Sequence, residues 1–543
     1  MKQQELTLLL CLIWILTLLY GEMFAYRVPP FFTCSWPHLH RTSSKVQTDS
    51  GSKQSDYVKV AVIADPQLMD RTSLHFPPKS RPLEIAEFYT DLNMRRSFFA
   101  SVMPFKPDAI LFLGDYFDGG PYLSDEEWQD SYRRFRNIFG LNEQGQYNDM
   151  KVFYIPGNHD IGYESHHSTK PQVIQRYEEK FGVRNYRFTV GKVDFIVVDS
   201  QTLDGNRQRH LTSQTWEFLK NMSVDDGVHP RVLVMHIPLY REDNTSCGPD
   251  RSSSPINQRI HHTVSGSTGY ISYQNYVTED STEYLLDTIK PFFWFLQKLI
   301  LSGHDHDQCS ITHQSKFGPV KEQTLGTISW QQGNLYPSFM LLSVINETHS
   351  NATEESLLTQ LCYLPWQTHI YIWYAVLYVL TILALLLWPT NSTSLWHQCR
   401  SIASNCKEIL SGILSRTEAK EKDEDANYEY EMIWDVGGTM HLVKKPRNTP
   451  IVNSSEQSGG EWGNAVMRPT ARKNAAQEAD LSVNVGMISG TAVDPLTRIH
   501  PSRTGKSRMK FVFQRLLRTI RAMTVIAVVN VPLYMMLLFK DWD

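Results

Sequence analysis

The stretches Ile155-Pro-Gly-Asn-His-Asp160 and Leu301-Ser-Gly-His-Asp-His306 decide the fold of this chain. Each begins where a short aliphatic run ends, which is typical of a buried strand followed by a tight turn. Three more runs end in polar groups: Tyr57–Ala64 before Asp65-Pro-Gln67, Ala109–Leu113 before Gly114-Asp115, and Val232–Met235 before His236. Ligands of α/β sheets bind beyond the carboxyl ends of strands. One such turn is more often structural, but five in order favour a single site.

Helical patterns alternate with these runs, over Leu83–Val102 and Asp125–Phe139, and Phe188–Val198 resembles a hairpin around Gly191. Buried strands that alternate with helices predict a layered α/β domain, which we assign to 57–345. Residues 241–281 form a long polar insertion without apolar periodicity, and such segments are usually functional or mobile.

In chain order, the segments after the five strands contain Asp-x-Gln, Gly-Asp-x-x-Asp-Gly, Gly-Asn-His-Asp, His and Gly-His-x-His. This order closely resembles the calcineurin-like metallophosphoesterase superfamily, with Gly-Asn-His-Asp and Gly-His-x-His as its most specific parts. The resemblance implies an α/β fold, a four-layer α/β/β/α sandwich. It also implies an enzyme that hydrolyses phosphoester bonds at a dinuclear metal centre. It implies two ligand sets that share Asp115: Asp65, Gln67, Asp115 and His306 for one metal, and Asp115, Asn158, His236 and His304 for the other.

The same resemblance gives roles to the neighbouring residues. His159 is not a ligand in the family pattern and is expected to stabilise the transition state or to protonate the leaving oxygen. Asp160 is expected to orient His159, and Asp118 and Asp305 are expected to support the ligands.

The donor types favour this chemistry by themselves. Carboxylate, amide and imidazole ligands without thiolate suit Mn, Fe, Zn or Mg. Two such cations about 3.5–4 Å apart can clamp the attacking and leaving oxygens of an in-line displacement. An imidazole such as that of His159 suits general acid–base catalysis.

Gln67 departs from the family pattern, which usually has Asp-x-His in the first motif. An amide oxygen binds hard cations but is a weaker donor than imidazole toward Zn. Of the two divalent ions, we therefore expect the one beside Gln67 to be Mn²⁺ or Mg²⁺ in preference to Zn²⁺, and this first site to be easier to strip. Asp118 stands where purple acid phosphatases have Tyr, so we set that subfamily aside.

Composition excludes several classes of function. A formal net charge of -4 is not the excess of positive charge that is typical of proteins binding polyanions, so we expect no nucleic acid partner. None of the seven cysteines forms a CxxC pair, which argues against a thiolate zinc site and thioredoxin chemistry. Four of them can form luminal disulfides in a pairing that the sequence leaves open: Cys34, Cys247, Cys309 and Cys362.

Three apolar runs, Leu6–Tyr20, His369–Trp388 and Met523–Phe539, predict an integral membrane protein. We expect the first, within 1–25, to be a signal anchor in preference to a cleaved signal peptide. We predict transmembrane helices over 369–388 and 523–539 and a linker over 26–56.

Basic residues cluster between the second and third runs, and none occurs between Lys321 and Arg400. The positive-inside rule then puts 391–522 in the cytosol, with 391–510 largely disordered, and the catalytic domain in the lumen. Sequons at Asn221, Asn244, Asn346 and Asn351 suit that side.

Within the superfamily, the wording of the motifs resembles the membrane metallophosphoesterases of glycosylphosphatidylinositol (GPI) anchor remodelling. The resemblance implies a manganese phosphodiesterase that removes ethanolamine-phosphate from a mannose of GPI anchors in the endoplasmic reticulum or early Golgi. The glycans of GPI-anchored proteins are then the substrate. Removal of the side group supports the export of these proteins from the endoplasmic reticulum. Two alternatives stay open: a metallophosphatase acting on another luminal phosphoester, and a non-catalytic membrane adaptor.

The run that precedes the last motif is longer than one strand needs. The surplus, Phe292–Lys298, is a membrane-facing loop, a distorted entry to the strand, or an artefact of the gene model. We favour the artefact.

Overall fold

The computed structural model describes residues 3–38, 57–224, 229–265, 268–288, 299–333, 336–346, 357–388, 428–434, 440–446 and 504–541. The chain divides into two compact units, Met1–Trp388 with Thr519–Asp543, and Pro389–Arg518. In the second unit, β14 (Tyr428–Trp434) pairs with β15 (Met440–Pro446). The rest of the predicted segment 391–510, apart from the first turns of the last helix, lies outside the described residues, as does Phe292–Lys298.

Two sheets form the centre of the first unit. One has the order β13-β12-β1-β2-β3, with β1 (Tyr57–Ile63), β2 (Ala109–Phe112), β3 (Lys151–Tyr154), β12 (Ser338–Ile345) and β13 (Leu357–Tyr363). The other has the order β10-β11-β9-β6-β5-β4, with β4 (Tyr186–Val190), β5 (Val193–Val198), β6 (Arg231–Met235), β9 (Leu299–Ser302), β10 (Cys309–Ser315) and β11 (Gly318–Thr324). Strands β1, β2 and β3 are parallel, and so are β5, β6 and β9.

Alternating side chains sort these strands into layers. In β1, Val60 and Val62 belong to the apolar cluster between the sheets, whereas Ala61 and Ile63 belong to a cluster on the outer face. The period of two residues along a strand produces this division. The outer faces are covered by helices, so the layers are helix, sheet, sheet and helix, as the α/β/β/α prediction requires.

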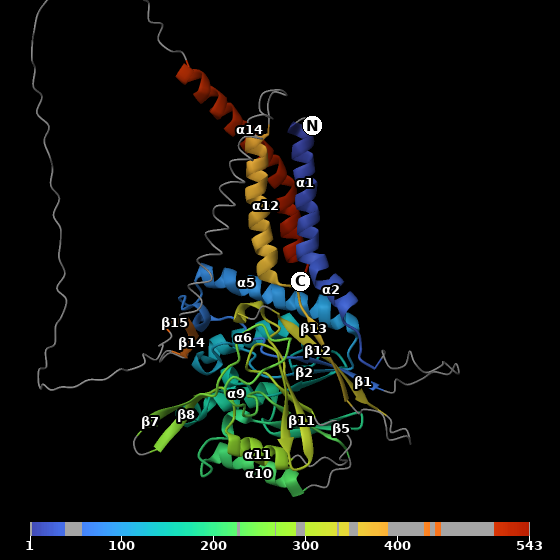
Figure 1. The fold of residues 1–543 in the computed structure, drawn as a ribbon, viewed down its shortest axis with the longest axis vertical. Helices are drawn as coiled ribbons and strands as arrows, with labels where there is room; N and C mark the ends of the chain where they lie inside the picture. The colour runs from blue at the N-terminus through green and yellow to red at the C-terminus, as the bar shows by residue number, and fades with distance from the viewer. Residues whose placement is uncertain are drawn as a thin grey trace, which may run out of the picture. The chain divides into compact units, whose positions relative to one another are not determined.

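The covering helices come from two parts of the chain (Figure 1). Those packed on the five-stranded sheet are α5 (Arg81–Arg96), α6 (Asp125–Phe139) and α9 (Gln172–Phe181). Those packed on the six-stranded sheet are α10 (His210–Val224) and α11 (Glu279–Thr288). Helix α6 begins where Ser124 and Glu127 form a capping box, and it ends at Gly140, whose φ is 63°.

Short elements complete the fold. The described residues contain the short α-helices α4 (Arg71–Leu74), α7 (Asn158–Ile161) and α8 (Glu164–Thr169). They also contain the π-helix η2 (Ser97–Val102) and the 3-10 helices η3 (Met103–Phe105), η4 (Gly120–Tyr122), η5 (Ser200–Thr202) and η6 (Trp330–Gln332). The helix predicted over Leu83–Val102 changes from α to π geometry at Ser97.

Strands also form in two segments where the sequence predicts none. Strand β13 pairs with β12 beyond residue 345, where the predicted domain ends. The insertion 241–281 contains a hairpin of β7 (Ile260–Ser265) and β8 (Thr268–Gln274).

Three helical segments are long and apolar enough to cross a membrane: Gln3–Thr33, Gln367–Leu387 and Met509–Phe539. They consist of α1 (Gln3–Leu19) with η1 (Tyr20–Phe24) and α2 (Ala25–Thr33), of α12 (Gln367–Leu387), and of most of α14 (Thr504–Phe539). Helices α1, α12 and α14 lie side by side, and Leu10, Leu385 and Ile526 are buried together (Figure 1).

Buried polar contacts attach these helices to the domain. Asn93 of α5 donates to Tyr26 Oη (2.7 Å) and to Gln367 Oε1 (3.0 Å). Tyr374 of α12 donates to Glu22 (2.8 Å), which forms a buried ion pair with Arg96. Because such groups are costly to bury unpaired, these contacts hold the helices and the domain in one arrangement.

The four candidate luminal cysteines form two disulfides. Cys34 pairs with Cys362, which ties α2 to β13, and Cys247 pairs with Cys309, which ties the insertion to β10. Cys11 is free and buried in α1.

We predict that replacing Cys247 and Cys309 with Ser lowers the free energy of unfolding by about 2–5 kcal/mol, because the cross-link restricts the unfolded chain. Chemical unfolding of the full chain measures the change. The control variant Cys11→Ala removes no cross-link. Peptide mapping without reductant must also recover both disulfides, and another pairing would contradict the structure.

Candidate metal centre

All predicted ligands follow the carboxyl ends of strands, and Asn158 is also the first residue of the short helix α7. Asp65 and Gln67 follow β1, Asp115 follows β2 and Asn158 follows β3, while His236 follows β6, and His304 and His306 follow β9. Five of these residues have positive φ: Asp65 (48°), Gln67 (39°), Asp115 (54°), His304 (72°) and His306 (57°). Non-glycine residues rarely adopt this conformation, and it clusters at functional sites.

Two glycines of the motifs are required by close approach. A Cβ on Gly157 would lie 2.0 Å from Asp115 Oδ1, and a Cβ on Gly114, whose φ is 87°, would lie 2.7 Å from His236 Nδ1. The side chains of Asp115 and His236 therefore occupy space that only glycine leaves open.

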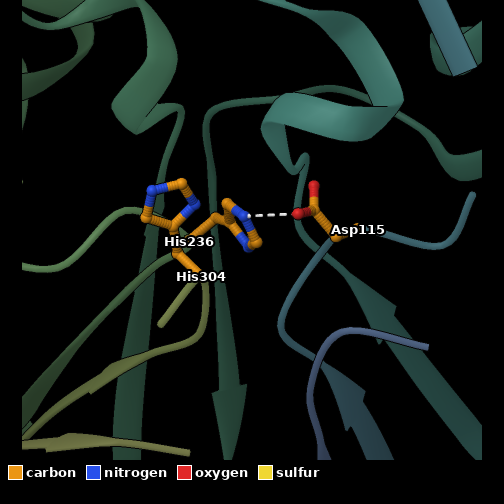
Figure 2. Close-up of side chains that lie close together, drawn as sticks. All are labelled: Asp115, His236 and His304. Atoms are coloured by element: carbon orange, nitrogen blue, oxygen red, sulfur yellow. Dashed lines mark ion pairs between the residues drawn. The ribbon is translucent and has the colours of Figure 1, made fainter. Parts of the chain in front are cut away.

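The described residues form two groups able to hold a metal ion. One is Asp115, His236 and His304, and the other is Asp65, Asp115 and His306; in each group the candidate donor atoms lie within 4.8 Å of one another. Asp115 belongs to both groups. Figure 2 shows the first group, in which the His236 ring lies between Asp115 and His304.

His236 joins the two sheets through both ring nitrogens. Its Nδ1 lies 2.7 Å from the carbonyl oxygen of Leu113, so this nitrogen donates a proton to it. Its Nε2 lies 3.1 Å from Asp115 Oδ2 and 3.0 Å from Asn158 Oδ1. With Nδ1 protonated, the lone pair of neutral Nε2 faces two oxygen acceptors. A proton or a metal cation has to lie among these three atoms.

Gln67 offers a similar observation. Its Nε2 donates to Asp115 Oδ2 (3.1 Å), and its side chain is fully buried. Among the described residues, its Oε1 has no hydrogen-bond partner. A buried amide oxygen without a donor is costly unless it binds something else, and a cation beside Asp115 fits that need.

The carboxylates and His236 of the site have pKa values far from their usual ranges. Burial raises the pKa of Asp65 to about 8, and the neighbouring Asp115 adds to that rise. Burial would also raise the pKa of Asp115, but His236 and His159 hold it well below its usual range. Burial disfavours a charged His236, yet Asp115 raises its pKa to about 9. A cation in place of the His236 proton would stabilise both carboxylates in their charged form.

His304 and His306 have the opposite behaviour. Burial lowers the pKa of each ring to about 3, so both are neutral imidazoles at physiological pH. Neutral imidazole is the form that binds metals. His304 Nε2 also lies 3.2 Å from the carbonyl oxygen of Gln274 in the insertion.

His159 lies beside the ligands and outside both groups. Its backbone N–H donates to Asp115 Oδ1 (2.8 Å). Its ring Nδ1 contacts the carbonyl oxygen of Asp118 and lies 3.6 Å from that residue's Oδ1. Burial lowers the pKa of His159, but Asp115 and Asp118 outweigh it and raise the pKa above its usual value.

Asp160 makes its described contacts with backbone amides. Its carboxylate accepts from the N–H groups of Asp115 (2.8 Å), Tyr116 (2.7 Å) and Gly157 (2.9 Å). It therefore fixes the turn that carries Asp115, and the contact with the His159 ring comes from Asp118. The predicted role of Asp160 in orienting His159 stays a prediction.

The insertion holds the last motif from outside, which the sequence analysis did not assign. Arg241 Nη1 donates to Asp305 Oδ2 (2.7 Å), and Asp307 Oδ2 accepts from the backbone N–H groups of Ser252 (2.9 Å) and Ser253 (2.7 Å). No motif marks these residues, so only the fold reveals them.

The comparisons with known proteins agree with this geometry. Residues 58–308 match the family model described as Calcineurin-like phosphoesterase. Cell division control protein 1 of Saccharomyces cerevisiae is 31% identical over 326 residues, which is 56% of this chain and 61% of the yeast protein. Metallophosphoesterase 1 of Rattus norvegicus is 26% identical over 423 residues, or 74% of this chain and 95% of the rat protein. The corresponding protein of Danio rerio is 28% identical over 331 residues, or 57% of this chain and 74% of the fish protein.

The matched stretch starts in β1 and ends just past His306, so it contains every strand end that carries a predicted ligand. The family as a whole implies divalent metals, and the Asp and His groups described above are able to bind them. Residues 58–308 are therefore a calcineurin-like phosphoesterase domain, and the protein that carries it is a phosphoester hydrolase.

Proposed function

We propose that two divalent ions, preferably Mn²⁺, bind between the sheets and share Asp115. The first would be held by Asp65, Gln67, Asp115 and His306, and the second by Asp115, Asn158, His236 and His304. The observation that supports this proposal is the convergence of His236 Nε2 with the oxygens of Asp115 and Asn158, where a cation can replace the His236 proton. Oxygen and imidazole donors suit hard and borderline cations.

When bound, such a pair of cations polarises a phosphoryl group and lowers the pKa of a coordinated water. The residues of the chain supply orientation and proton transfer. The contact of His159 Nδ1 with the Asp118 carbonyl fixes the ring and leaves Nε2 to carry a proton to the leaving oxygen. Asp160 accepts from the N–H groups of Asp115 and Tyr116, and from that of Gly157, so it would hold the turn that carries the shared carboxylate in place.

We infer that the substrate is the ethanolamine-phosphate side group on a mannose of a GPI anchor. The resemblance of the motifs to membrane metallophosphoesterases of GPI remodelling supports this, as does the similarity to proteins named Metallophosphoesterase 1. GPI glycans are luminal, which agrees with the orientation expected from the basic residues.

The position of the site beside a membrane helix also supports a substrate held in the bilayer. Gln331 of η6 donates to the backbone oxygen of Gln67. Its neighbour Trp330 packs edge-on against Tyr371 of α12, with ring centroids 6.3 Å apart. The first ligand turn is thus two contacts away from the foot of a candidate membrane span. An enzyme acting beside the leaflet suits the removal of a group close to a lipid anchor.

Metal content tests the shared carboxylate. Wild-type full chain saturated with Mn²⁺ should retain about two ions per molecule, as a dinuclear site requires, by elemental mass spectrometry. Asp115→Asn should lose both ions and His306→Ala only the first. Asp118→Asn, a matched carboxylate outside both groups, should keep them. Fewer than about one ion on the wild-type chain would end the proposal.

Removal of His159 tests proton transfer separately from metal binding. His159→Ala should lower kcat on an ethanolamine-phosphate mannoside by about 10²–10⁴-fold with metal content unchanged. His229→Ala, at the other end of β6, is the matched control.

GPI glycans from cells lacking the protein should keep the side group, and only the wild type and the control should remove it. Equal or faster hydrolysis of simple phosphomonoesters would favour another luminal substrate, and metal-loaded chain inert to all esters would favour an adaptor.

Gln67→His tests the departure from the family pattern. An imidazole at this position should bind Zn²⁺ at the first site roughly tenfold more tightly, because nitrogen is the better donor for zinc. The rate at which a chelator removes one of the two ions measures this. Gln67→Glu serves as the control that keeps an oxygen donor. An unchanged rate in Gln67→His would mean that this side chain does not face the ion.

A further inference from the structure

A cavity lined by charged residues lies where the candidate membrane helices meet the phosphoesterase domain. Its volume is about 210 Å³. The lining comes from η1 and α2, from α5 and η2, and from the end of α14, and consists of Glu22, Met23, Tyr26, Arg27, Arg95, Arg96, Phe99, Ala100, Lys540 and Asp541. Figure 1 shows these segments meeting at the foot of the helices, next to the C-terminus.

Four basic residues line the cavity against two acidic ones. Both acids contact the same arginine, because Arg96 forms ion pairs with Glu22 and with Asp541 (3.1 Å), and the other three bases outweigh the negative charge that is left. Arg96 also donates to the carbonyl oxygen of Leu537 (2.6 Å), so its position is fixed by α14. The cavity therefore carries a net positive charge.

The other three bases remain to attract an anion. Arg95 donates to backbone oxygens of Asp541 and Asn137, and its guanidinium lies 4.9 Å from the centre of the Phe99 ring. Lys540 Nζ lies 3.7 Å from Met23 Sδ, and Arg27 and Lys540 are exposed. Within the described part of the chain, none of these three side chains forms an ion pair with a carboxylate.

Exposed aromatic side chains indicate the depth of this cavity in a membrane. Phe31 and Phe32 of α2 are 76% and 79% exposed, and Val28 is exposed on the same helix. Helix α2 directly continues the span of α1, so these apolar groups have the surface of the bilayer to cover them. Arg27 lies within the same turn as Val28. The cavity thus lies at the level of the lipid headgroups.

We propose that this cavity binds the phosphate of an anionic phospholipid headgroup. Arginine and lysine supply charge-assisted donors that match phosphate oxygens, and the net positive charge of the cavity favours an anionic headgroup over a zwitterionic one. The volume is below the roughly 300–1,000 Å³ of pockets for drug-sized ligands, which fits one headgroup and excludes a whole glycan. The proposal does not depend on the substrate inferred above, although the inositol phosphate of a GPI lipid shares the same chemistry.

Native mass spectrometry of the full chain in detergent tests the proposal, with dioleoyl phosphatidylinositol, dioleoyl phosphatidylcholine and inorganic phosphate as separate probes. Phosphatidylinositol should bind more tightly than the other two. The variant Arg27→Gln/Lys540→Gln should weaken this binding by roughly thirtyfold, since each basic residue near the surface contributes about fivefold. Arg27→Lys/Lys540→Arg keeps the charge and should retain the affinity.

The matched control is Lys192→Gln/Lys220→Gln, which removes two exposed lysines from the turn between β4 and β5 and from α10. It should leave lipid binding unchanged. Hydrolysis of a soluble phosphodiester should be the same in both double variants, which shows that each has folded. Equal binding of both lipids, or no loss in Arg27→Gln/Lys540→Gln, would overturn the proposal. Tight binding of inorganic phosphate alone would reassign the cavity to a free anion.

Discussion

The buried carboxylate of Asp115 is the constraint on which the two sheets depend. It comes from the five-stranded sheet and faces His236 from the six-stranded sheet at 3.1 Å. His159 and Gln67 donate to its oxygens, while Asp160 holds its backbone N–H. A carboxylate removed from water needs such compensation. The glycines that admit it and the histidine that meets it are therefore parts of one arrangement.

That arrangement is strained, and the layers of the domain stabilise it. Five ligand residues have positive φ, and a non-glycine residue in such a conformation costs about 1–3 kcal/mol. Two of the strands that precede them are completely buried, since β2 and β9 consist only of buried residues. Well-packed strands determine where each turn begins, so the turns have little freedom to relax. The strain thus keeps several donor atoms directed at the same small volume.

The strand ends could be predicted because each one joins a short apolar run to a motif, and both signals are local in the sequence. The five strand runs, helix α6 and the convergence of the ligands follow from such signals. The pairing of Cys34 with Cys362 could not be predicted, since it depends on how distant segments meet. Strand β13 alternates weakly, and the hairpin β7–β8 is polar, so neither carries an apolar pattern. The contacts of Asp160 with three amides also depend on the tertiary fold, and a motif shows only that an acid is present.

Contacts at two places connect the candidate metal centre and its domain to the candidate membrane helices. The backbone of Gln67 contacts Gln331, and the neighbouring Trp330 packs on Tyr371 of α12. On another side of the domain, Asn93 and Arg96 of α5 join α2, α12 and α14 through buried hydrogen bonds and an ion pair. A domain attached at two places cannot rotate about a single linker. The ligand turns therefore keep one orientation toward the helices, and the lipid-anchored substrate proposed above would reach them from a defined direction.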